Sequence, residues 1–106
     1  MNKVSVFELA GEFAENKDAA RDIRESKIRP VLESGQEISI DFGRVSLTTQ
    51  SFIHALLSEL IRSLGPDILD RVQFKNCNEN VQGIIMIVIE YSQDGYDEDE
   101  DEAADG

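Results

Sequence analysis

The sequence contains very few residues of the kinds that build redox, metal or hydrolytic sites. It has a single cysteine, Cys77, and a single histidine, His54. One cysteine cannot form a disulfide within the chain or supply a cysteine-based zinc site. The sequence also lacks a glycine-rich phosphate loop and a dinucleotide-binding motif. We therefore expect neither a metal nor a cofactor, and we do not expect an enzyme.

Long hydrophobic runs are also missing. No apolar stretch approaches the roughly 20 residues that a membrane-spanning helix needs, and the first residues do not have the charged and apolar regions of a secretory signal. These features predict a cytoplasmic protein with no membrane partner. The 106 residues, 41% of them hydrophobic, are enough for one domain with one core.

Positive charge is scarce, since 10 Lys and Arg residues face 22 Asp and Glu residues and the net charge is −12. Such a chain repels the backbone of nucleic acids, so direct nucleic-acid binding is not expected and a basic protein partner fits better. Residues 94–106 hold eight of the acidic residues and no basic one, which leaves residues 1–93 with a net charge of −4.

This charge distribution predicts a folded domain at residues 1–93 and a disordered acidic tail at residues 94–106. A block of like charges with almost no apolar residues cannot offset the entropy lost on ordering. The simplest role for such a tail is to keep the protein soluble. Mimicry of a nucleic-acid backbone and attraction of a basic partner are the functional alternatives.

Strand-like and helix-like patterns alternate along residues 3–91. Residues 38–42 alternate apolar and polar side chains as a half-buried strand does, and Pro30 is expected to interrupt the first helix. The alternation predicts an α/β fold with helices packed against a small mixed sheet. The expected strands span residues 3–9, 37–42 and 71–77, and the expected helices span residues 16–35, 49–65 and 80–91.

The last predicted helix carries more apolar surface than one buried face can use. Three apolar residues lie beside or outside its apolar stripe, namely Met86, Ile87 and Tyr91. Such a surplus is typical of an interface, either between two copies in a homodimer or with another protein. The alternative is that the β-branched residues 84–89 form a buried strand instead.

The segment ISIDFGRVSLTTQSFIHALLSELI, residues 38–61, resembles the strand-to-helix region of STAS domains, which occur in sulfate transporters and anti-sigma-factor antagonists. It resembles more closely the STAS-like domain family of unknown function. In the antagonists, an Asp-Ser-Ser-Gly turn carries the phosphorylated serine. Aligned from Asp41, Ser51 takes the position of that serine, whereas Thr49, Gln50 and Phe52 differ from the motif.

The resemblance implies a regulatory module that binds a protein partner, with a histidine-kinase-type ATPase as the kinase of a phosphorylation switch at Ser51. The partner surface would include the residues around that serine, which are Thr48, Thr49, Gln50, Phe52 and His54. The structural alternative is that the hydroxyl residues only cap the helix. His54 follows Ser51 by three residues, but helix neighbours at this spacing seldom have the geometry of a base acting on a nucleophile.

A second function from another class is compatible with the same sequence. The acidic surface and tail would suit an inhibitor or decoy, of phage or mobile-element origin, that acts on a nucleic-acid-binding enzyme.

Overall fold

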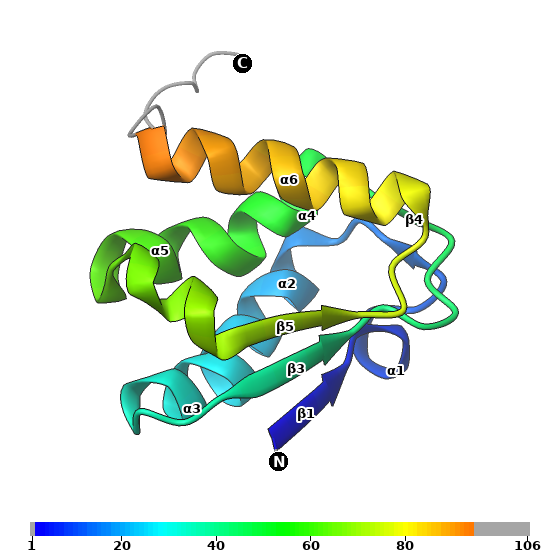
Figure 1. Cartoon of the computed structure of the whole chain (residues 1–106). Helices are drawn as coiled ribbons and strands as arrows, with labels where there is room; N and C mark the ends of the chain where they lie inside the picture. Colours follow the sequence, from blue (N-terminus) through cyan, green and yellow to red (C-terminus); the bar gives the residue numbers. More distant parts are fainter. Residues whose placement is uncertain (1, 95–106) are drawn as a thin grey trace.

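The computed structural model describes residues 2–94, with side chains up to Ser92. The chain forms an α/β fold with two small parallel sheets (Figure 1). This confirms the predicted fold class. The disorder that we predicted for the acidic tail concerns residues that lie, apart from Asp94, outside the described part of the chain.

The main sheet has three short strands in the order β1-β3-β5, namely β1 (Asn2–Ser5), β3 (Ile38–Asp41) and β5 (Val72–Lys75). All three run parallel, whereas we expected a mixed sheet. Parallel neighbours require a long crossover between them, and the helical segments that separate these strands provide it. The core face is apolar and the other face carries mostly exposed polar residues such as Lys3, Gln73 and Lys75.

The first long helical segment covers residues 17–33. It consists of α2 (Lys17–Ile23), a π-helical turn η1 (Arg24–Ile28) and α3 (Arg29–Glu33). Asn16 caps it as predicted, because its Oδ1 accepts hydrogen bonds from two backbone N–H groups. The predicted interruption is seen as the wide π-helical turn, which ends at Ile28, two residues before Pro30 and its missing backbone N–H.

The second long helical segment covers residues 50–64 and confirms the predicted helix. It consists of α4 (Gln50–Ile53), a second π-helical turn η2 (His54–Ser58) and α5 (Glu59–Leu64). Gly65, with φ of 96°, ends it, and the 3-10 helix η3 (Pro66–Arg71) follows. Arg24 donates to the Ala55 carbonyl at 2.8 Å, so one arginine joins the two π-helical turns.

Three short elements were not predicted. The expected first strand stops at Ser5, because that side chain accepts from the Glu8 N–H at 3.2 Å and caps the one-turn helix α1 (Val6–Ala10). The strands β2 (Phe13–Ala14) and β4 (Leu47–Thr48) then pair in parallel as a separate ribbon, called the β2–β4 ribbon below.

The chain continues from β5 into the long helix α6 (Glu79–Asp94), whose first turn is capped by Asn78. Its buried stripe includes Val81, Ile85 and Val88, and it packs against α4, η2 and β4. The alternative of a strand at residues 84–89 is therefore wrong. None of the helices in the described region has the length and apolar character needed to cross a membrane.

Candidate functional site

The start of the second helical segment, at α4, follows directly after the short strand β4. Thr49 is the N-cap, and its Oγ1 accepts from the Phe52 N–H at 3.0 Å. Gln50 and Ser51 follow in the first turn with exposed side chains. The Ser51 hydroxyl makes no hydrogen bond to the described part of the chain, so Ser51 is not the cap.

Two residues that we expected on the partner surface are buried. The Thr48 hydroxyl donates to the Ala14 carbonyl at 2.8 Å and ties β4 to β2. The Phe52 side chain is fully enclosed in the core. Both expectations are corrected, because the alternation of β4 and the first turn of α4 direct these side chains inward. Thr49, Gln50, Ser51 and His54 remain at or near the surface.

An apolar pair that the sequence did not reveal adjoins this helix start. Phe13 and Leu47 are 52% and 50% exposed, and they are register partners in the β2–β4 ribbon. Partners in neighbouring strands place their side chains on the same face of a sheet, so these two form one exposed apolar patch. Two-residue strands are too short to show a period, so no pattern in the sequence pointed to this pair.

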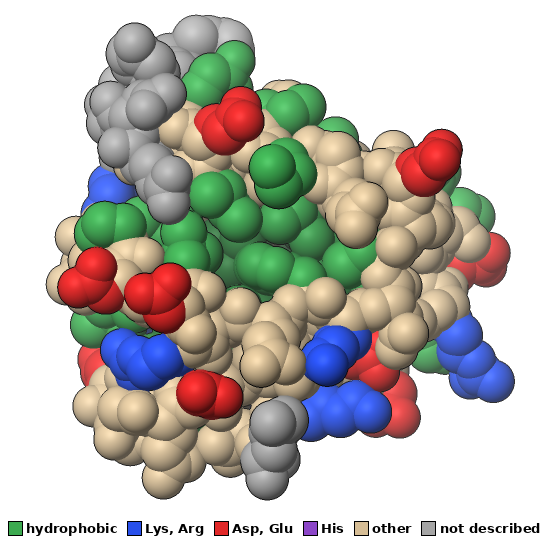
Figure 2. Space-filling model, viewed as in Figure 1, with side chains coloured by type: hydrophobic (Ala, Val, Ile, Leu, Met, Phe, Trp, Pro, Cys, Tyr) green, Lys and Arg blue, Asp and Glu red, His purple; other side chains and the backbone are tan. Residues whose placement is uncertain are grey.

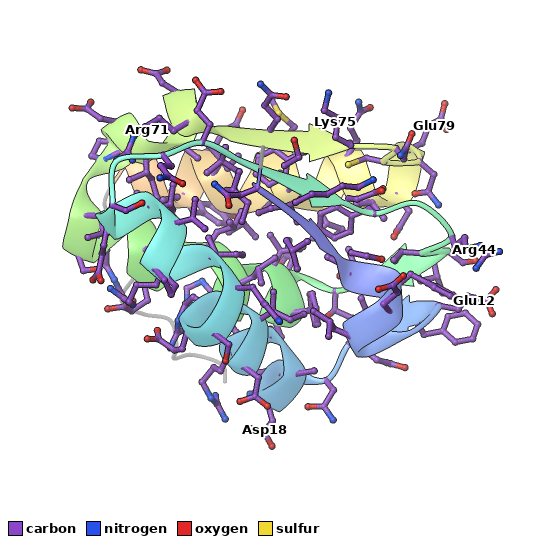
Figure 3. The ribbon with its side chains drawn as sticks, turned by 90° about the horizontal axis from the view of Figure 1, so that it is seen from below. Glu12, Asp18, Arg44, Arg71, Lys75 and Glu79 are labelled. Carbon is purple, nitrogen blue, oxygen red and sulfur yellow. The ribbon has the colours of Figure 1, made fainter. Side chains whose placement is uncertain are left out.

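The ribbon is fixed to the rest of the fold by polar side chains. Asn80 Oδ1 accepts from the Thr48 N–H at 3.1 Å, and Asn78 Nδ2 donates to the Ser46 carbonyl at 3.0 Å. The Glu12 carboxylate accepts from the Ser46 hydroxyl at 2.9 Å. Glu12 lies at the same end of the molecule as Arg44 (Figure 3). The patch therefore sits on a segment anchored to the first turn of α6.

His54 does not act on Ser51. Its Nδ1 forms a hydrogen bond of 3.0 Å with the hydroxyl of Ser58, one turn later on the same helix. Ser58 is buried, and its hydroxyl also bonds to the Ser92 hydroxyl of α6 at 3.0 Å. This chain joins η2 to the end of α6, so His54 contributes to packing between two helices.

Asp41, which matches the motif, organises the loop that leads to the ribbon. Its Oδ1 accepts from the Asn76 side chain at 3.0 Å and from the Gly43 N–H at 2.8 Å, and Lys3 lies 3.4 Å from the other oxygen. These bonds lower the pKa of the Asp41 carboxyl. Burial raises the pKa of the nearby Cys77 thiol, and the Asp41 charge adds to that effect. Cys77 is therefore a protonated thiol rather than a reactive thiolate.

The three interface candidates on α6 are all exposed, but they do not form a single patch. Successive helical residues are rotated by about 100°. Ile87 and Tyr91 are four residues apart and share one side of α6, whereas Met86 lies about 100° away from Ile87. Within residues 2–94, no group of three or more potential ligands could hold a metal ion.

A family model described as a STAS-like domain of unknown function matches residues 19–82. The matched segment runs from α2 into the first turn of α6 and includes the helix start with Ser51. Searches of curated proteins and of solved structures gave no match.

Proposed function

Because this chain belongs to the family of STAS-like domains of unknown function, we propose that it is a non-catalytic module that binds a protein partner. The contact surface is the start of the second helical segment together with the exposed face of the β2–β4 ribbon. A phosphate on Ser51 regulates that contact. The partner is an ATPase of the histidine-kinase type that acts as the kinase.

The observation that carries this proposal is the exposed hydroxyl of Ser51, which makes no hydrogen bond within residues 2–94 and lies in the first turn of a helix whose cap is already Thr49. Backbone N–H groups at a helix start lack helical partners, and the helix dipole makes this end positive. A phosphate added to Ser51 would be stabilised there without disturbing the cap. The fold thus supports both the modified and the unmodified form.

The apolar patch explains how that phosphate would control binding. Leu47 precedes Ser51 by four residues and pairs with Phe13, so a partner that covers this apolar pair together with the helix start desolvates Ser51. A new negative charge inside such a contact is costly unless the partner offers a cation. Phosphorylation would therefore release the partner while the domain stays folded.

The test uses the purified full-length chain and a histidine-kinase-type ATPase from the same organism. Wild type, Ser51→Ala and Ser51→Asp are titrated against that ATPase by calorimetry, and mass spectrometry locates any phosphate after incubation with ATP. We expect phosphate on Ser51, wild-type affinity for Ser51→Ala, and a loss of about tenfold or more for Ser51→Asp.

Two controls separate the switch from simpler effects. Ser63→Asp adds the same charge at the far, exposed end of the same helical segment and should leave binding unchanged. Leu47→Ser should weaken binding of both the wild-type and the Ser51→Ala forms, because it removes part of the apolar patch. Equal affinities for Ser51→Ala and Ser51→Asp would eliminate the switch. Binding that depends only on residues 95–106 would instead favour the acidic decoy.

A further inference from the structure

The surface of the molecule carries hollows with different linings. Figure 2 shows an apolar hollow between α6 and the strand β5, and an apolar lining by itself does not specify one ligand. A smaller groove, with a volume of about 250 Å³, lies where α1 packs beside the first long helical segment. Its lining combines apolar and charged side chains, so it selects the chemistry of the molecule that binds there.

The apolar part of this groove comes from both helices. Leu9 of α1 forms one wall, and its side chain is 46% exposed. Ala19 and Ile23 of α2 lie four residues apart, and therefore on the same side of their helix. Ile23 is buried in the core, so the floor of the groove is continuous with the core. An apolar group placed in the groove thus contacts side chains of both helices.

The polar part of the lining consists of Asp22, Ser26 and Lys27. The two charged side chains are exposed, and neither forms an ion pair within residues 2–94. Asp22 and Lys27 are five residues apart, which is more than one helical turn, so they border different stretches of the groove. The lining has one charge of each sign. A ligand with a single charge would leave the other side chain without a partner.

Ser26 and Lys27 belong to the π-helical turn η1. Turns of this kind are rare in α-helices and are frequent at functional sites. Here the turn is fixed by Arg24, which donates to the Ala55 carbonyl of the second helical segment at 2.8 Å. The backbone that carries the two polar side chains is therefore held in place without a ligand, which reduces the entropy lost on binding.

We propose that this groove binds a free amino acid with an aliphatic side chain, such as leucine. The ammonium group of the ligand lies against the Asp22 carboxylate. Its carboxylate lies against the Lys27 ammonium group and accepts a hydrogen bond from the Ser26 hydroxyl. Its side chain packs between α1 and α2. The site does not include the surface at Ser51, so it does not depend on the function proposed above.

Size and charge favour this ligand over larger ones. Sites for drug-sized ligands have volumes of roughly 300–1,000 Å³, so a groove of about 250 Å³ suits a smaller molecule. An apolar side chain within a partner's polypeptide is flanked by neutral peptide groups, which would leave Asp22 and Lys27 without opposite charges. A free amino acid carries one ammonium group and one carboxylate next to its side chain, so it matches both.

The test titrates L-leucine into the isotope-labelled full-length chain, and amide shifts in nuclear magnetic resonance spectra show where it binds. We expect saturating shifts for residues 19–27 and around Leu9. Isocaproate lacks the ammonium group of leucine and isoamylamine lacks its carboxylate, so each should bind at least about fivefold more weakly. Serine lacks the aliphatic side chain and should bind at least about tenfold more weakly. If N-acetyl-leucinamide, which has neither charge, binds as tightly as leucine, the groove takes a side chain of a peptide and the proposal is wrong.

Single substitutions assign the two charges. Asp22→Asn should weaken leucine binding about fivefold and leave isocaproate binding unchanged, whereas Lys27→Gln should weaken leucine binding about fivefold and leave isoamylamine binding unchanged. Lys17→Gln is the control, because it removes a positive charge at an exposed position of α2 that does not line the groove. It should change the affinity less than about twofold. Equal effects of the two lysine changes would overturn the proposal.

Leu9→Ser and Leu47→Ser form a matched pair, because the two leucines are exposed to similar extents, 46% and 50%. Leu9 lines the groove, whereas Leu47 belongs to the β2–β4 ribbon. Leu9→Ser should weaken leucine binding at least about fivefold, and Leu47→Ser should change it less than about twofold. Leu47→Ser acts instead on the contact proposed at Ser51, so the two proposals can fail separately. Equal effects of the two leucine changes, or no shifts in residues 19–27, would contradict an amino-acid site in this groove.

Discussion

Two hydroxyl residues in the same helix start should respond in opposite ways to the same substitution. Thr49→Ala removes the cap and leaves the Phe52 N–H, which Thr49 Oγ1 binds at 3.0 Å, without a partner. Loss of an N-cap costs about 0.5–2 kcal/mol. Because Phe52 is fully buried and water has limited access to this bond, we expect about 1–2 kcal/mol, in the upper part of that range.

Ser51→Ala should not destabilise the protein. The Ser51 side chain is exposed and makes no hydrogen bond to the described residues, and alanine has a higher helix propensity than serine by up to about 0.5 kcal/mol. We therefore expect the free energy of unfolding to stay the same or to rise slightly.

Urea denaturation of the two variants and the wild type, followed by circular dichroism, measures this difference. A thermal scan provides a second measure, since 1 kcal/mol corresponds to about 4–8 °C in Tm for a domain of this size. If Ser51→Ala costs as much as Thr49→Ala, the serine takes part in capping and its hydroxyl is not free for modification. If neither change has an effect, the helix start does not depend on side-chain capping.

Three further changes test other parts of the fold. Asp41→Asn should cost about 1–3 kcal/mol at neutral pH. Because the pKa of Asp41 in the folded protein lies below the ordinary value of an aspartate carboxyl, this loss of stability should be complete above that ordinary value and disappear as the pH falls through the folded pKa. Urea denaturation across acid pH measures it. Arg29→Ala should cost about 1–2 kcal/mol, because this largely buried arginine pairs with Glu59 on the other long helical segment and with Glu25 on its own segment. The control is Arg21→Ala, which removes an exposed arginine and should change the free energy of unfolding by less than about 0.5 kcal/mol. An equal loss for both variants would show that the ion pairs of Arg29 do not stabilise the fold. Deleting residues 95–106 should leave Tm nearly unchanged in calorimetry at fixed salt, because a block of like charge contributes little to a core. A large decrease in Tm would show that these residues dock on the domain.

Local signals in the sequence were sufficient for the long helices. Asn16 and Asn78 stand at helix starts and Gly65 at a helix end, and the structure uses each of them in that way. These signals act over a few residues, and an apolar stripe with a period of 3.6 residues is equally local. Pro30 also acts locally, because its missing N–H disturbs the helix whatever the helix packs against.

The β2–β4 ribbon shows what local signals cannot supply. Phe13 and Leu47 are more than thirty positions apart, and their pairing depends on how the chain between them folds. No pattern within a two-residue strand identifies its partner, so the exposed apolar patch beside Ser51 appears only in three dimensions. The groove beside Leu9 is of the same kind, because it exists only where α1 packs beside the first long helical segment.

The sequence by itself determined the fold class, the helix start with its hydroxyl residues, and the family resemblance carried by residues 38–61. The tertiary structure alone decided the role of each hydroxyl residue. Thr48 forms a hydrogen bond within the β2–β4 ribbon, Thr49 caps the helix, and Ser51 faces solvent. The physical reason is that composition and spacing set what a side chain can do. Which hydrogen bond it makes, and whether water still reaches it, depends on contacts between segments distant in sequence.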